Sequence, residues 1–189
     1  ATTPPISASR SPIKTITPRP SATLKPSGKI ITQTVPFTAQ APFGEWSDQR
    51  QQDGCEEASA LMAVSWARGE TFTLQEAKEK ILAIADWEQE NYNNYRDTSA
   101  ADTVERIYKI YFKFNSANIE LKYNISANDI LKELEAGKLV VIPSDGRQLG
   151  NPNFTAPGPE HHMLVIIGYD YGTEDFITND PGTRQGKNY

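Results

Sequence analysis

The sequence predicts an α+β domain in which a helical half precedes an antiparallel sheet. Helix-type apolar spacing and helix caps are confined to residues 53–137, whereas short β-rich runs bounded by Gly, Asp and Pro fill residues 139–178. Helices followed by strands are typical of domains whose helices pack on one antiparallel sheet. No internal repeat is visible in the 189 residues, and this length suits one compact domain plus a tail.

The start of the chain has a different composition from the rest. Residues 1–33 hold six of the thirteen prolines, many Ser and Thr, and no periodic apolar pattern. We therefore predict a disordered linker at 1–33 and a folded domain at 34–189. Such stretches commonly separate a secreted domain from a membrane anchor or a cell wall, although a plain flexible terminus has the same composition. An extracellular or surface-tethered location is therefore expected.

The first half of the domain should begin with a short strand at residues 34–37. A helix follows at 53–69, where Gly69 is the stop signal and Cys55 lies in the first turn. Its apolar face consists of Ala58, Leu61, Met62 and Ser65.

Three more helices and three strands complete the predicted domain. Thr73 and Glu76 form a capping box for the second helix, a third begins after Ser99, and a fourth spans residues 126–136. The strands are expected at residues 139–142, 163–168 and 176–178.

The charge is unevenly distributed along the chain. Residues 1–35 carry five of the 19 basic residues and none of the 24 acidic ones, so the remainder has a net charge of −10. An acidic body repels phosphate backbones, which argues against a nucleic-acid partner and favours neutral or cationic peptides. No apolar run is long enough for insertion into a membrane, and a monomer is expected.

The single cysteine is a candidate nucleophile. A lone cysteine forms no intrachain disulfide and is most often a small buried hydrophobic residue. Cys55, however, follows Gly54 at the start of a helix, where free backbone N–H groups favour the thiolate. The thiolate is the attacking species in thiol catalysis.

A base for such a thiol has to be His161 or His162, the only histidines. Neighbouring residues on a strand face opposite sides, so only one of the two can face the cysteine. Asp180 closes the next strand and could orient the imidazole, with Asn179 as its rival. The cluster of Glu160 with the two histidines lacks the spacing of common zinc sites, so neither a metal nor another cofactor is expected.

Four blocks of sequence carry a family resemblance. VPFTAQAPFGEW, DGCEEASALMA, HHMLVIIGYD and FITNDPGT resemble, in this order, the blocks of bacterial cysteine peptidase family thirty-nine and its stand-alone relatives. The resemblance covers residues 35–183 and implies a papain-like fold. It also implies a bacterial cysteine peptidase that acts on peptides.

The resemblance assigns a role to individual residues. The family's nucleophile falls on Cys55, its base on His162 and its orienting acid on Asp180. Gln40, which closes the first block, looks like the donor to the oxyanion. Gln49, six residues before the cysteine, is its rival by spacing.

One position departs from the family pattern. The family usually continues Cys-Gly-Pro, whereas this chain has Cys55-Glu56-Glu57. The two acids either receive a substrate amino group or are ordinary charges at a helix start. Negative charges in this turn oppose ionisation of a neighbouring thiol.

A long loop at residues 144–160, rich in Gly, Pro and Asn, directly precedes the expected base. It could form a wall of the substrate groove. Trp46 and Phe154 are candidate aromatic residues of that groove.

The sequence thus predicts thiol-dependent hydrolysis of a peptide or related amide through an acyl-enzyme. Two alternatives stay open. One is a catalytically silent domain that binds peptides or cell-wall components in the same groove, and the other is a thiol acyl transferase.

Overall fold

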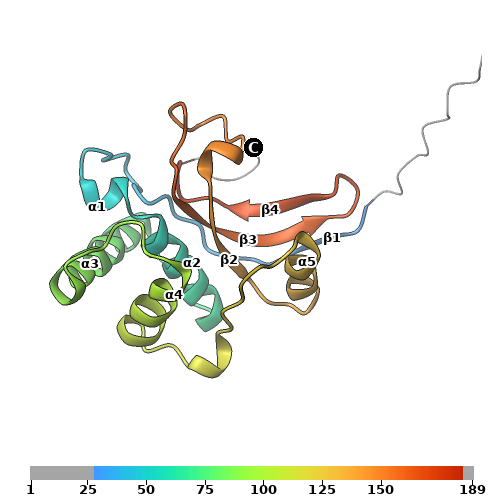
Figure 1. Ribbon diagram of the computed structural model, residues 1–189, viewed down its shortest axis with the longest axis horizontal. Helices are drawn as coiled ribbons and strands as arrows, with labels where there is room; N and C mark the ends of the chain where they lie inside the picture. The colour runs from blue at the N-terminus through green and yellow to red at the C-terminus, as the bar shows by residue number, and fades with distance from the viewer. Residues whose placement is uncertain (1–27, 185–189) are drawn as a thin grey trace, which may run out of the picture.

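A computed structural model describes residues 28–184 and confirms the α+β class. The sheet has four strands, and the helices lie mainly to one side of it (Figure 1). The strands are β1 (Ile30–Thr32), β2 (Val140–Ser144), β3 (His162–Asp170) and β4 (Asp175–Asn179). The helices are α1 (Gln49–Gln52), α2 (Cys55–Arg68), α3 (Leu74–Tyr92), α4 (Ala100–Asp102), η1 (Thr103–Tyr111), η2 (Ser116–Asn118), α5 (Ala127–Glu135) and η3 (Gly146–Gln148).

Strand β3 is the centre of the sheet, and all its neighbours run antiparallel to it. β2 pairs with its first half, with Ser144 opposite His162, and β1 pairs with its last three residues, with Ile30 opposite Asp170. β4 pairs with residues 165–170 of β3. The residues paired with β4 overlap those paired with β2 and those paired with β1, and a strand has only two edges. β1 and β2 therefore lie end to end along one edge of β3, and β4 lies along the other.

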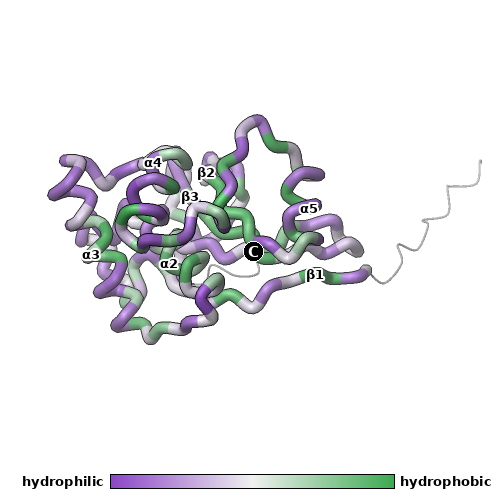
Figure 2. Tube along the Cα trace, turned by 90° about the horizontal axis from the view of Figure 1, so that it is seen from below, coloured by the Kyte–Doolittle hydropathy of each residue, from purple (hydrophilic) through white to green (hydrophobic). Residues whose placement is uncertain are grey.

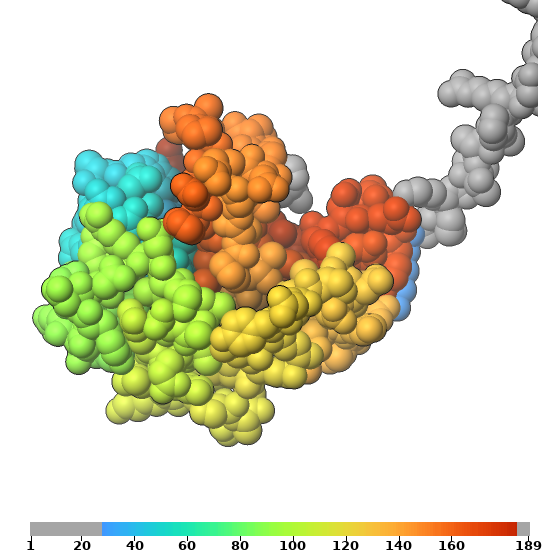
Figure 3. Space-filling model, viewed as in Figure 1, coloured from blue at the N-terminus to red at the C-terminus, as the bar shows by residue number. Residues whose placement is uncertain are grey.

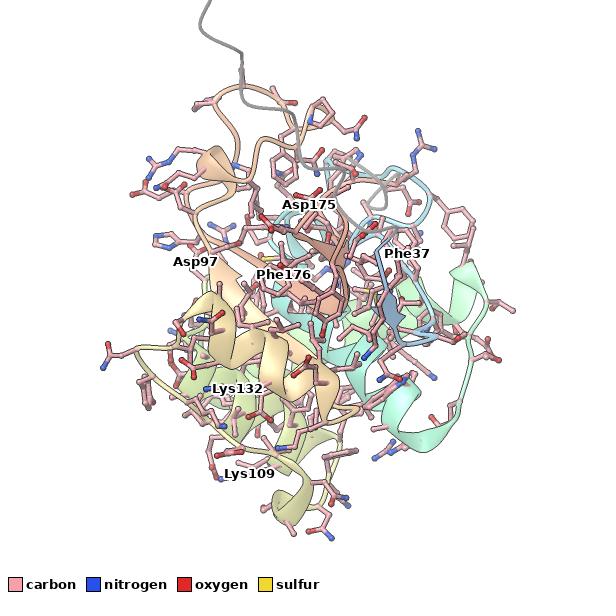
Figure 4. All side chains as sticks on the ribbon, turned by 90° about the vertical axis from the view of Figure 1, so that its right-hand side faces the viewer. Phe37, Asp97, Lys109, Lys132, Asp175 and Phe176 are labelled. Atoms are coloured by element: carbon pink, nitrogen blue, oxygen red, sulfur yellow. The ribbon has the colours of Figure 1, made fainter. Side chains whose placement is uncertain are left out.

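The two faces of the sheet are covered by different helices. Val165 of β3 packs with Met62 of α2 on one face, whereas Leu164 packs with Leu134 of α5 on the other. This alternation follows from the two-residue period of a strand. Figure 4 looks onto α5, which lies in front of the sheet with Lys132 on the helix. Figure 2 shows hydrophobic residues concentrated around the strands and polar residues along α3.

The helix boundaries confirm the local signals. Gly69 ends α2 with φ at 67°, a left-handed conformation that glycine adopts without a steric penalty. Thr73 and Glu76 form the expected capping box of α3, and Ser126 with Asp129 forms another at α5.

The third predicted helix differs in its geometry. After one α-helical turn it continues as a π-helix, with Phe112 N–H bonded to Ile107 O. A π-helix has a wider turn than an α-helix. Thr103, Ile107 and Tyr108 are the buried residues of this segment.

The N-terminal boundary needs a correction. No strand forms at residues 34–37; the first strand is β1, inside the range predicted as linker, because Ile30–Thr32 pair with the distant end of β3. Residues 1–27 of the predicted linker lie outside the described residues. Helix α1 was not predicted. None of the helices in residues 28–184 is long and apolar enough to cross a membrane.

Candidate active site

Cys55 is the first residue of α2. Gly54 precedes it, and a Cβ at Gly54 would lie 2.6 Å from the carbonyl oxygen of Arg50. Glycine therefore allows α1 to approach the start of α2 closely. The cysteine is 5% exposed, and it is free.

Two backbone contacts fix the start of β3 beside this helix. Ser59, one turn after Cys55, donates a hydrogen bond to Met163 O at 3.1 Å. The Met163 N–H faces the Cys55 sulfur and acts to lower the pKa of the thiol. Since Met163 follows His162, the imidazole is brought to the same end of α2.

His162 and Asp180 form a buried pair. His162 Nε2 lies 2.7 Å from Asp180 Oδ1, and the two side chains are 2% and 0% exposed. A carboxylate accepts hydrogen bonds, so we assign the proton of the neutral imidazole to Nε2. Nδ1 then carries a lone pair, which is the form that a thiol's base needs.

Asp180 is itself held by two donors. The Gly182 N–H bonds to Oδ1 at 2.7 Å, and Asn151 Nδ2 bonds to Oδ2 at 3.0 Å. The Phe154 ring packs edge-on against His162, with centroids 5.3 Å apart. The long loop thus contributes Asn151 and Phe154, which fix the carboxylate and the imidazole.

The two candidate oxyanion donors occupy different environments. Gln40 is buried between the loop before α2 and the loop after β4: its Nε2 donates to Gln52 O at 2.7 Å and its backbone N–H to Pro181 O at 2.9 Å. One N–H of its side-chain amide remains for another acceptor. Gln49 is exposed, and its amide donates to Asp53. The buried position beside the Asp180 loop favours Gln40.

Glu56 is turned towards the thiol rather than towards water. It is 3% exposed, and the Cys55 thiol donates a hydrogen bond to its Oε2 at 2.9 Å. Burial raises the pKa of Glu56 to about 7. Burial, and then the charge of Glu56, raises the pKa of Cys55 well above its ordinary value. In this resting arrangement the thiol keeps its proton.

Glu57 is not among the residues that line the groove, so the structure does not place it as the predicted substrate contact. Its carboxylate is fully buried, and neither of its oxygens has a hydrogen-bond partner among the described residues. Burial raises the pKa of Glu57, and nearby Glu56 and Glu88 raise it further. Glu88 of α3 is also fully buried, and burial raises its pKa to about 8.

The Glu88→Gln change is expected to flatten the dependence of stability on pH. An acid whose pKa rises from 4.5 to about 8 on folding loses its stabilising contribution as the pH climbs through that window. Between pH 5 and pH 8 the unfolding free energy should fall by about 2 kcal/mol less in the variant than in the wild type. Urea unfolding at both pH values measures this. The exposed Glu90 on the same helix provides the control, and an equal effect of Glu90→Gln would contradict the assignment.

A groove of about 1640 Å³ opens at this cluster. Its lining includes Glu56, His161 and His162 at one end and the whole of β2 along its length. Trp46 is not part of this lining, so the structure does not place it in the groove as predicted. Phe154 contacts the imidazole but also lies outside the lining.

Three supporting residues were missed by sequence reasoning. Asn151 and Gly182 lie in turn-forming sequences, GNPN and DPGT, where such residues are ordinary. Ser59 is one polar residue on the face of an apolar helix. Its hydrogen bond to Met163 O joins residues 104 positions apart, so no local sequence pattern could predict it.

The site has a thiol at the start of a helix, a histidine at the start of the central strand and a carboxylate after the next strand. This arrangement is typical of papain-like architecture. Residues 32–189 match the Peptidase_C39 like family, and the chain belongs to this family. No curated protein and no solved structure matches the chain. Membership confirms the resemblance carried by the four sequence blocks and indicates a peptidase-type function. The roles of individual residues stay predictions.

Proposed function

We propose that the protein hydrolyses a peptide or related amide bond through an acyl-enzyme formed on Cys55. The observation that carries this proposal is the buried His162–Asp180 pair, at 2.7 Å, beside the cysteine and at the end of a groove. A buried carboxylate that fixes the tautomer of a histidine is characteristic of nucleophilic catalysis. The groove supplies room for an extended substrate.

The proposed steps use Cys55, His162 and Gln40. The Cys55 thiol turns from Glu56, gives its proton to His162 Nδ1, and the sulfur attacks the scissile carbonyl. The resulting oxyanion accepts hydrogen bonds from the backbone N–H of Cys55 and the amide of Gln40. His162 then protonates the leaving amine, and a water molecule, deprotonated by His162, releases the acid and restores the thiol.

A catalytically silent domain is the second candidate. It is favoured by the Cys55–Glu56 hydrogen bond, since a thiol held by a carboxylate resists ionisation. In that reading the groove binds its ligand without cleaving it.

One experiment separates these functions from acyl transfer. A library of end-capped peptides is incubated with the protein in ¹⁸O-labelled water containing a primary amine, and the products are analysed by mass. Hydrolysis puts one ¹⁸O atom into each new carboxylate, and acyl transfer gives amine adducts. Intact peptides throughout the library would contradict the enzyme proposal.

Alkylation of Cys55 by iodoacetamide tests the state of the thiol. Burial, and then the negative charge of Glu56, raises the pKa of Cys55. Glu56→Gln removes the second cause, so it should lower the pKa of the thiol and speed alkylation at pH 7 by about tenfold. The rate is measured by mass from pH 5 to pH 9. Equal rates in both proteins would show that Glu56 does not control the thiol.

Gly182→Ala is expected to lower kcat by about tenfold to a hundredfold with little change in KM. An added Cβ would lie 2.5 Å from Phe154 Cε1 and 2.9 Å from His162 Cε1, so the imidazole has to move. Turnover of a cleaved library peptide measures this. Gly172→Ala, in the distant turn after β3, is the matched control and should keep its kcat.

A further inference from the structure

The outer edge of β2 is open. β2 pairs with β3 along one edge, and within residues 28–184 no strand pairs with the other. The groove follows this edge, because residues 139–144 line it without a break. A strand edge along a groove presents a row of main-chain donors and acceptors.

The register shows which main-chain groups of β2 point into the groove. The C=O of Met163 accepts from Ser59 and its N–H faces Cys55, so neither points towards its partner Pro143. In an antiparallel pair such positions alternate, so Val141, two residues earlier, also directs its N–H and C=O outward. Proline at an outward position is consistent with this, because it has no N–H to donate.

We propose that the substrate binds as an extended segment that adds a strand to the outer edge of β2. Its main chain bonds to the N–H and C=O of Val141 and to the C=O of Pro143. This inference rests on the proposed function and specifies its substrate as unfolded polypeptide rather than a small amide. Because Ser144 is paired with His162, the added strand leads directly to His162.

The opposite wall indicates which side chains the segment should carry. Leu121, Tyr123 and Ile125 line the groove, and they are 36%, 69% and 38% exposed. They belong to the segment 113–126, which leads from the helical half to α5 along the lower side of the molecule in Figure 3. Alternate residues of an extended peptide face one side, so apolar residues are expected at every second position. Val141 lies three residues from Ser144, about 10 Å along the strand.

A scan of backbone N-methylation tests the added strand. End-capped decapeptides are selected from a library for binding to the Cys55→Ser variant, which keeps a hydroxyl donor for Glu56. Each amide of the tightest binder is then methylated in turn, which removes one N–H without changing a side chain. Methylation at alternate amides that face β2 should weaken binding tenfold or more, and methylation between them should change it less than twofold. Uniform effects along the peptide, or no binder in the library, would overturn the proposal.

Two surface variants test the position of the bound segment. Tyr123→Ser removes an exposed ring of the groove wall and should weaken binding of the selected peptide by about tenfold. Leu74→Ser, which also changes an exposed apolar residue but lies outside the groove, should not. Equal affinity in all three proteins would place the peptide elsewhere. Alternating effects without turnover would support the added strand and contradict the hydrolase, while turnover with uniform effects would do the reverse.

Discussion

Cys55→Ala is expected to reduce peptide turnover to background, a fall on the order of 10⁶-fold. The change removes the only thiol, and among the described residues no other cysteine could replace it. The site around it should persist, because the His162–Asp180 pair and the Ser59–Met163 hydrogen bond do not involve the sulfur. Initial rates and circular dichroism of the variant check both expectations.

Cys55→Ser is the matched control for this change. The serine hydroxyl can still donate to Glu56, so any loss of stability caused by an unpaired Glu56 should be absent. Its turnover should nevertheless be at background, because a hydroxyl is a far weaker nucleophile than a thiolate here. Wild-type turnover in either variant would exclude catalysis by Cys55.

Asp180→Ala should lower kcat by about tenfold to a thousandfold, although the variant keeps the Cys55 nucleophile. The change removes the acceptor of His162 Nε2 and also leaves the buried Gly182 N–H and Asn151 amide without this partner. The imidazole then loses both its fixed tautomer and its orientation. Asn179→Ala is the control, because Asn179 is the rival residue for orienting the imidazole. A larger fall in kcat for Asn179→Ala than for Asp180→Ala would contradict our assignment.

Asp180→Asn allows a finer test. With its oxygen on His162, the new amide nitrogen would face Asn151 Nδ2, so two donors meet where a donor and an acceptor lie 3.0 Å apart. Asp180→Asn should therefore lower kcat, and Asn151→Asp in the same protein should restore part of it by supplying an acceptor. No rescue in the double variant would show that Asn151 does not position the carboxylate.

Features governed by local chemistry were predictable. The cap at Thr73 and the stop at Gly69 depend on neighbouring residues, and both were found where the sequence indicated. The fourth helix likewise begins after Ser126, close to its predicted start. The four family blocks predicted the fold class and the elements that carry the candidate triad. Of the oxyanion candidates, both were named but only their burial distinguishes them.

Features that depend on distant contacts were not predictable. β1 lies in a stretch rich in Thr and Pro, and it is a strand because residues 168–170 offer it an edge. Acids in a first helical turn are ordinarily exposed, whereas Glu56 and Glu57 are covered by elements that follow later in the chain. The π-helical geometry of η1 likewise reflects packing rather than propensity.

The candidate site and the N-terminal attachment lie at opposite ends of β3. His162 begins the strand, whereas β1 joins it at residues 168–170, about 20 to 27 Å away at the rise of a β-strand. Whatever precedes Gly28 therefore attaches at the end of the sheet remote from the His162–Asp180 pair. In the surface-tethered location that we propose, the attachment point would lie at one end of β3 and His162 at the other, so large polypeptides could approach His162 unhindered. Immobilisation on beads through the N-terminus should, for the same reason, preserve turnover.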